Sequence, residues 1–274
     1  MPYTSTQTRI SYADYGPSDG KPVVLIHGWP LSHRMWEYQI GALAEAGHRV
    51  VAYDRRGFGE SDKPWDGYDY DTLTQDLTGL IDELDLRDAA LVGFSMGGGE
   101  VARYLAPYGS DRVRSAVLMS SVTPAMGKGP DNPNGVPAET LAGFGEAMEN
   151  DRIGFLDKFN RTFFGVTSDR NDVISAPLLH HFRDIASWAN PKATLACAES
   201  FGSTDFTDDV KKIDVPTLII HGDADRTVPY EATALRAAEM IDGSRLETLK
   251  GAPHGLFYTH RTQVNELLLD FLSA

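Results

Sequence analysis

A serine between two glycines is the residue of this chain best placed to do chemistry. Ser95 lies in the run Val92-Gly-Phe-Ser-Met-Gly-Gly-Gly99, so that Gly93 and Gly97 complete the pattern Gly-x-Ser-x-Gly. Small residues at these two positions allow the sharp strand-to-helix turn that exposes a serine hydroxyl. The apolar run 89–92 predicts the strand, and apolar residues at helical spacing after the turn predict the helix. We therefore expect Ser95 to be a nucleophile.

A serine hydroxyl needs a base to take its proton, and a third group must orient that base. After a turn of this kind, the chain order is serine, acid, histidine. Asp223 and Asp225 follow the apolar run 217–220, and His254 lies in a Gly/Pro loop after another strand-like run. We predict Asp225 as the acid because it lies further out on its loop. Asp223 is expected to cap the turn through its own backbone.

The oxyanion formed by serine attack needs two N–H donors. One belongs to the residue after the nucleophile, Met96, and the other to the loop after an earlier strand. The apolar run 23–26 leads into His27-Gly-Trp-Pro30, which makes the Trp29 N–H the second candidate. His27 is expected to support this loop rather than to react. We also predict a cis bond between Trp29 and Pro30, because cis prolines belong to tight turns.

On these residues the chain resembles the α/β-hydrolases, and within them the cofactor-free haloperoxidases, also described as arylesterases and perhydrolases, with related γ-lactamases. The resemblance covers nearly the whole chain, and its most specific parts are the runs Phe-Ser-Met-Gly-Gly-Gly99 and Asp54-Arg-Arg-Gly-Phe-Gly59. It implies the triad Ser95, Asp225 and His254 and the oxyanion donors Trp29 and Met96. It also implies a small ester or carboxylic acid and hydrogen peroxide as substrates, with no cofactor. Halogenation would then follow from a peracid released into solution.

Several other activities would use the same triad. A γ-lactamase or amidase and a C–C bond hydrolase remain alternatives, and so does a small-molecule receptor on the same fold. Dehalogenase and epoxide-hydrolase activities are disfavoured, because relatives with those activities carry aspartate where this chain has Ser95. His180 and His181 lack the spacing that would bring three metal ligands together. No glycine-rich dinucleotide fingerprint follows a strand.

Strand-like runs alternate with helical patterns along most of the chain. The expected strands cover residues 8–15, 23–26, 49–53, 89–92, 115–119, 217–220 and 245–249. Such alternation predicts a mainly parallel sheet with helices on both faces, as in the α/β-hydrolase fold. Pro/Gly-rich sequence and aromatic helices interrupt the alternation from 122 to 212. We interpret this segment as a helical cap inserted into a core formed by 1–121 and 213–274.

The cap is expected to close a compact, apolar substrate pocket suited to short acyl or aromatic groups. The residues predicted to line it are Pro30, Val122, Met126, Phe144 and Val228.

Composition narrows the classes of function. The chain has 274 residues, which suits one large domain, and its 25 basic and 39 acidic side chains give a net charge of −14. Such a surface repels phosphate backbones and anionic lipids, so neither nucleic acid nor membrane is an expected partner. A single cysteine, Cys197, fits a reducing compartment. No signal peptide or membrane span is apparent, so we expect a cytoplasmic enzyme, and the resemblance suggests a homo-oligomer.

Overall fold

One twisted sheet organises the chain. The computed structural model describes residues 1–273, and within them seven strands form a sheet in the order β1-β3-β2-β4-β5-β6-β7. The strands are β1 (Tyr12–Tyr15), β2 (Pro22–Ile26), β3 (Arg49–Tyr53), β4 (Ala89–Phe94), β5 (Val113–Met119), β6 (Thr217–Gly222) and β7 (Arg245–Leu249). Only β1 runs antiparallel to its neighbour. The predicted fold class is confirmed, although the first strand begins only at Tyr12.

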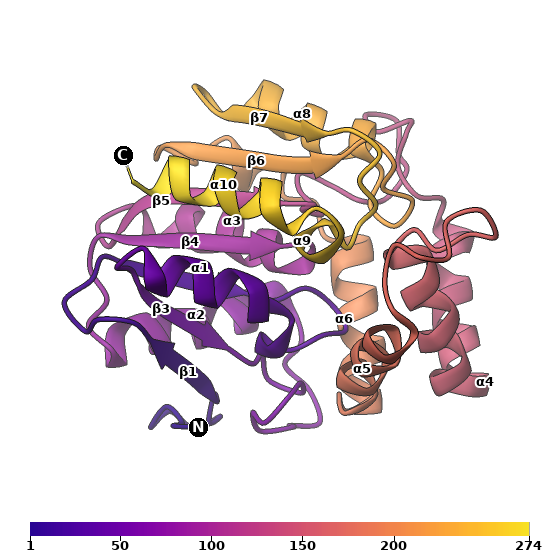
Figure 1. Cartoon of the computed structure of the whole chain (residues 1–274), viewed down its shortest axis with the longest axis horizontal. Coiled ribbons are helices and arrows are strands. Elements are labelled where there is room, and N and C mark those ends of the chain that lie inside the picture. Colours follow the sequence, from indigo (N-terminus) through magenta and orange to yellow (C-terminus); the bar gives the residue numbers. More distant parts are fainter. Residues whose placement is uncertain (274) are drawn as a thin grey trace.

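The central strands are buried on both faces, and this explains why they read as continuous apolar runs rather than alternating ones. Every residue of β4 and β6 is buried. In the register, Gly93 near the end of β4 pairs with Ile26 of β2 and with Leu118 of β5. Because these strands are parallel, their carboxyl ends meet at one edge of the sheet, at the arrowheads in Figure 1. The loops that carry the predicted site residues therefore converge there.

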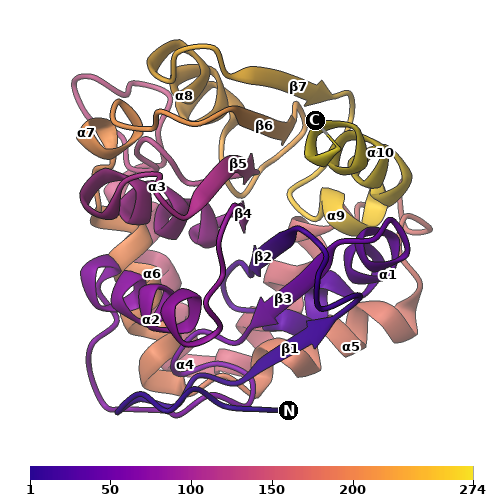
Figure 2. The ribbon, with the colours of Figure 1, turned by 90° about the vertical axis from the view of Figure 1, so that its left-hand side faces the viewer.

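Helices cover both faces of the sheet, as Figure 2 shows. On one face lie α1 (Glu37–Glu45) and α10 (Arg261–Leu272), with the short α9 (Leu256–Thr259). On the other face lie α2 (Tyr70–Glu83), α3 (Met96–Tyr108) and α8 (Ala234–Met240), and two 3-10 turns, η1 (His33–Trp36) and η2 (Tyr230–Ala232), complete the loops. The amphipathic pattern of α2 buries Leu73, Leu77, Leu80 and Ile81. Its first turn is capped by the Asp69 carboxylate, which accepts the Thr72 N–H.

A group of helices is inserted between β5 and β6. It consists of α4 (Ala138–Phe163), α5 (Ala176–Ser187), α6 (Pro191–Ser203) and the short α7 (Thr207–Val210). The first three lie together beyond the carboxyl ends of the strands (Figure 1). Asp151 interrupts α4 with non-helical angles (φ −153°, ψ 85°), and its carboxylate accepts the Gly154 N–H at 2.9 Å. The helix is thus kinked at Asp151 and restarts from a new cap.

Two peptide bonds that precede proline are cis. Trp29–Pro30 is one of them, as predicted, and Thr123–Pro124 is the other, which the sequence analysis did not anticipate. Among residues 1–273, no helix combines the length and the apolar character needed to cross a bilayer.

Candidate active site

Ser95 occupies the tight turn between β4 and α3. Its backbone lies in the left-handed region, with φ 54°, and its N–H donates to the Met119 carbonyl at 2.8 Å. A Cβ on Gly93 would lie 2.4 Å from the Gly97 carbonyl oxygen, and a Cβ on Gly97 would lie 2.5 Å from that of Ile26. Any larger residue at either position would force the turn apart. The two glycines therefore hold the serine in place.

Three predicted residues form one chain of hydrogen bonds. His254 Nε2 lies 3.0 Å from Ser95 Oγ, and its Nδ1 lies 2.6 Å from Asp225 Oδ2. Because an ionised carboxylate can only accept, Nδ1 carries the proton and Nε2 is left free to take the serine proton. The imidazole is held between the rings of Phe94 and Phe163, whose centroids lie 4.9 Å and 4.8 Å away. This packing fixes the orientation of the ring.

Asp225 is buried, and its carboxylate accepts three hydrogen bonds and has a second histidine close by. The backbone N–H groups of Thr227 and Val228 donate to Oδ1, and His254 donates to Oδ2. His221 Nε2 donates to the Val228 carbonyl at 3.0 Å and lies 3.2 Å from Asp225 Oδ2. Burial alone raises the pKa of a carboxyl, but the two histidines outweigh it, and the pKa of Asp225 falls well below its ordinary value. The carboxylate is therefore ionised across the physiological range.

Two details of this acid loop differ from the sequence-based interpretation. The carboxylate of Asp223 binds the N–H of Gly251 on the neighbouring loop, and so it joins two loops rather than capping its own turn. His221 was not singled out, although it lies four residues before Asp225 and both are buried. Its position as the penultimate residue of β6 makes it look like an ordinary strand residue.

The two predicted oxyanion donors belong to residues close to the serine: Met96 follows it in the chain, and Trp29 lines the same cavity. Neither the Trp29 N–H nor the Met96 N–H donates a hydrogen bond to another group in residues 1–273. Met96 also begins the 13-residue helix α3, whose N-terminus carries partial positive charge. The Trp29 side chain is buried and donates from Nε1 to the Thr194 carbonyl at 2.9 Å. This bond ties the oxyanion loop to α6 of the insertion.

A buried network supports the loop from behind. His27 accepts the Arg55 N–H at Nε2 and donates from Nδ1 to the Gly28 carbonyl. Burial, together with the nearby Arg55 charge, lowers the pKa of His27 to about 3, so the ring stays neutral. Arg55 also pairs with the buried Glu100. We call His27, His33, Asp54, Arg55 and Glu100 the loop network, and it matches the supporting role expected for His27.

The serine and the histidine open on a small cavity with a free volume of about 10 Å³, which is room for about one water molecule. Four of the five predicted pocket residues line it, namely Val122, Met126, Phe144 and Val228. Pro30 is buried but is not among the lining residues, whereas its neighbour Trp29 is. Three further residues line it, Phe159, Phe201 and Thr227; the aromatic pattern of the cap makes Phe159 a candidate, and nothing in the sequence indicates the other two. Both phenylalanines have the helical spacing of ordinary core residues.

With this geometry established, comparison with known proteins identifies the chain's relatives. Residues 21–261 match the family model of the alpha/beta hydrolase fold. The chain belongs to the α/β-hydrolase family. This hydrolase is 49% identical to a bromoperoxidase from Bacillus anthracis, whose crystal structure superposes with a TM-score of 0.96 over 100% of this chain and 99% of that one. The predicted family is thereby confirmed.

Two further relatives align over their whole length. A non-heme chloroperoxidase of Kitasatospora aureofaciens is 41% identical, with 100% of each chain covered. A bifunctional esterase/perhydrolase of Acinetobacter calcoaceticus is 37% identical, again with 100% of each chain covered.

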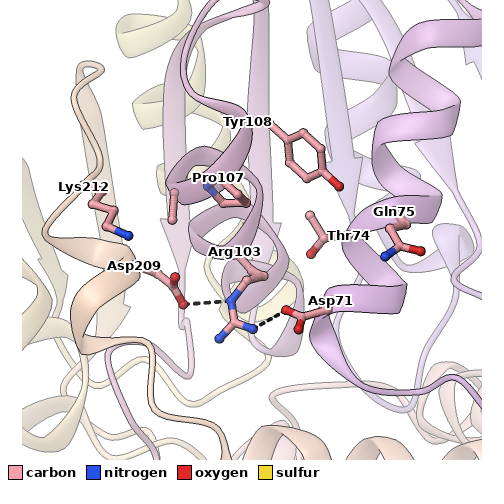
Figure 3. A pocket seen from close by; sticks show the side chains of 9 residues that line it. Asp71, Thr74, Gln75, Arg103, Pro107, Tyr108, Asp209 and Lys212 are labelled. Carbon is pink, nitrogen blue, oxygen red and sulfur yellow. Dashed lines mark hydrogen bonds and ion pairs between the residues drawn. The ribbon is translucent and has the colours of Figure 1, made fainter.

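The hydrolase has a larger cavity elsewhere, of about 500 Å³, between α2, α3 and α7. Figure 3 shows Arg103 at its centre, paired with Asp71 on one side and Asp209 on the other. Both carboxylates already neutralise the guanidinium, and no serine or histidine lines the cavity. No set of three or more His, Cys, Asp or Glu side chains across residues 1–273 is arranged to hold a metal ion. The cavity beside Ser95 is therefore the candidate active site.

Proposed function

We propose that this hydrolase cleaves short-chain or aromatic carboxylic esters through an acyl-enzyme on Ser95, and that hydrogen peroxide competes with water for that intermediate. The observation that carries the proposal is the unbroken chain of hydrogen bonds from Asp225 through His254 to a serine that faces an apolar cavity.

In the first half of the reaction, Ser95 Oγ attacks the ester carbonyl while His254 Nε2 takes the hydroxyl proton. The oxyanion accepts from the Trp29 and Met96 N–H groups, each contributing about 2.7–4 kcal/mol of transition-state stabilisation. His254 then returns its proton to the alcohol oxygen as the C–O bond breaks. The alcohol leaves, and the acyl group stays on Ser95.

In the second half, His254 takes a proton from the incoming nucleophile, which attacks the acyl carbonyl. Water gives the carboxylic acid, and hydrogen peroxide gives the peracid. Collapse of the oxyanion returns the proton to Ser95 and restores the resting enzyme. A peracid that diffuses away would oxidise halide in solution, so halogenation needs no redox cofactor in this scheme.

The size of the cavity supports small substrates. Its walls are apolar, and its free volume of about 10 Å³ requires side chains to move before any ester can enter. Phe144 is half-buried and lies on the part of α4 before the interruption at Asp151. We propose that residues 122–212 act as a cap on the core of 1–121 and 213–274, with Phe144 moving on entry.

The alternative activities are distinguished by which substrates the enzyme turns over. A γ-lactamase or amidase and a C–C bond hydrolase would use the same triad, and a panel of esters, a bicyclic lactam and acetate with peroxide would rank them. A receptor would release p-nitrophenol from p-nitrophenyl acetate only once per chain. The relatives named above, a chloroperoxidase and an esterase/perhydrolase, favour the ester and peracid chemistry.

The decisive experiment is Ser95→Ala. We expect kcat for p-nitrophenyl acetate and for peroxide-dependent bromination in acetate to fall together, by a factor on the order of 10⁶ as in serine-protease knockouts. Ser110→Ala, the same change just beyond the far end of α3, is the matched control and should keep both activities. Bromination that survives in Ser95→Ala would show that peracid is not made on this serine.

A further inference from the structure

A second cavity adjoins the catalytic cavity and shares three of its walls, Phe144, Phe159 and Thr227. Its free volume is about 290 Å³, against about 10 Å³ for the inner cavity. We call it the vestibule, and its lining is Phe144, Phe155, Lys158, Phe159, Thr162, Arg226 and Thr227. A substrate held at Ser95 that is longer than the inner cavity would extend into this space.

The vestibule contains two exposed cations without partners. Lys158 lies on α4, and Arg226 directly follows Asp225 in the chain. In the part of the chain that the structure describes, neither forms an ion pair, and no acidic side chain lines the vestibule. Within residues 1–273 Asp225 forms no ion pair with Arg226, and its carboxylate is directed at Thr227, Val228 and His254 instead.

This arrangement contrasts with the rest of the surface. The chain carries a net charge of −14, and Arg161, one turn further along α4 than Lys158, is paired with Asp157. An acidic surface repels anions at a distance, whereas within a Debye length of about 8–10 Å the local charges dominate. Two unpaired cations beside the catalytic cavity therefore create a local site for a negative charge.

A third polar group lies where the two cavities meet. The hydroxyl of Thr227 is buried and has no hydrogen-bond partner among residues 1–273, and the residue lines both cavities. A buried hydroxyl without a partner is costly, and an oxygen atom of a bound substrate would remove that cost. Phe155 and Phe159 stack with centroids 5.8 Å apart and supply an aromatic wall beside it.

We propose that the vestibule binds a carboxylate on the part of the substrate that projects from the catalytic cavity. Lys158 and Arg226 would pair with the carboxylate, Thr227 would donate to an oxygen near the cavity mouth, and the phenylalanines would pack against the group between them. The enzyme would thus prefer esters whose leaving group is anionic over neutral esters of the same shape. This inference rests on the proposed function and names the substrate class of that site.

Two isosteric aryl acetates test it, 4-acetoxybenzoate and the neutral 4-acetoxybenzamide. Both would give the same acetyl-enzyme on Ser95, and they release 4-hydroxybenzoate and 4-hydroxybenzamide. The readout is the ratio of their kcat/KM values, which cancels any general damage to the site. We expect this ratio to fall about two- to fivefold in Arg226→Gln and in Lys158→Gln, and about tenfold in the double variant. In the wild type it should also fall as NaCl is raised.

Two variants separate a local site from other effects. Arg226→Lys keeps the charge and should keep the ratio within about twofold of the wild type. Lys21→Gln makes the same charge change at the amino end of β2, away from the carboxyl ends where the site lies, and should leave the ratio unchanged. A ratio that is unchanged in the double variant, or that falls equally in Lys21→Gln, would overturn the inference while the proposed function stands. If the wild type turns over neither ester, the proposed function fails and the inference fails with it.

Discussion

The hydrolase contains two buried aspartate–histidine pairs of nearly the same geometry. His254 Nδ1 lies 2.6 Å from Asp225, and His33 Nδ1 lies 2.7 Å from Asp54. Both carboxylates also accept backbone N–H groups. Burial raises the pKa of each carboxyl, but its hydrogen-bond partners lower it further, so both pKa values lie below the ordinary one. Measured by distance, burial and charge, the two pairs are equivalent.

Their surroundings differ. The outer nitrogen of His254 reaches a serine held at positive φ, and both face a cavity. Asp54, by contrast, accepts from the backbone of His33 and of Glu60 and so closes two loops on each other. An aspartate–histidine pair therefore stabilises a loop unless a nucleophile and a cavity lie at its far end. A catalytic role therefore requires the serine and the cavity as well as the aspartate–histidine pair.

The largest expected difference between the two pairs lies in what their carboxylates do, and Asp225 is tested first. Asp225→Asn should lower kcat for p-nitrophenyl acetate by about 10⁴, a value borrowed from the serine-protease triad, because an amide holds histidine in the wrong tautomer. Asp223→Asn, on the same loop but outside the triad, is the control and should cost far less. Steady-state kinetics on both variants test this, and the reverse ranking would show that Asp223 is the acid.

Asp54→Asn should act on stability instead. An asparagine cannot accept all three donors that meet Asp54, and one charge-assisted bond among buried groups is left unmade. We expect the free energy of unfolding in urea to fall by about 2–3 kcal/mol, while kcat of the folded variant changes less than about tenfold. A loss of kcat as large as that of Asp225→Asn would break the comparison, since both pairs would then be catalytic.

The sequence was most informative where one local rule dominates. Gly93 and Gly97 allow a single kind of turn around Ser95, and parallel strands with buried faces need continuous apolar runs, so the elbow and the sheet could be predicted. The choice of Asp225 over Asp223 rested on reach along a loop, and the structure brings Asp225 to His254.

The rest depends on how distant segments pack. Phe159 and Phe201 line the cavity only because α4 and α6 meet over the ends of the strands, and helical spacing cannot separate a cavity wall from a core position. Pro30 is predicted as a pocket residue from a tight turn beside Trp29, but in the fold only Trp29 of these two lines the cavity. His221 was missed because a histidine in a buried strand carries no local sign of its partner.

His221 offers a smaller test of the same contrast. Its Nε2 donates to the Val228 carbonyl at 3.0 Å and lies 3.2 Å from Asp225 Oδ2, which makes it a candidate positioning residue for Asp225. In His221→Leu the pKa of Asp225 should rise towards its ordinary value, because His221 is one of the groups that lower it, and kcat should fall about tenfold through the loss of this contact and of the bond to Val228. The acid limb of the kcat/KM profile should move to higher pH. His221→Gln, which keeps a donor, should restore most of the activity, and an unmoved acid limb in His221→Leu would show that the bond does not tune the acid.

His27 of the loop network should make the free energy of unfolding depend on pH. The pKa of His27 is about 3 in the folded chain, against about 6.5 in an unfolded one. Between these values the unfolded state binds one more proton than the folded state, so stability falls as pH falls, by up to about 1.4 kcal/mol per pH unit. Asp54 and Asp225 also have lowered pKa values, but their contribution changes mainly below about pH 4 to 5 and is present in the wild type and in the variant alike. Urea unfolding between pH 4.5 and 6, in the wild type and in His27→Gln, isolates the contribution of the histidine. The slope of the free energy of unfolding against pH should be smaller in the variant, by an amount that corresponds to the uptake of nearly one proton on unfolding.

Equal slopes would mean that His27 is protonated in the folded chain, and the loop that carries Trp29 would then pack on a cation rather than on a neutral ring.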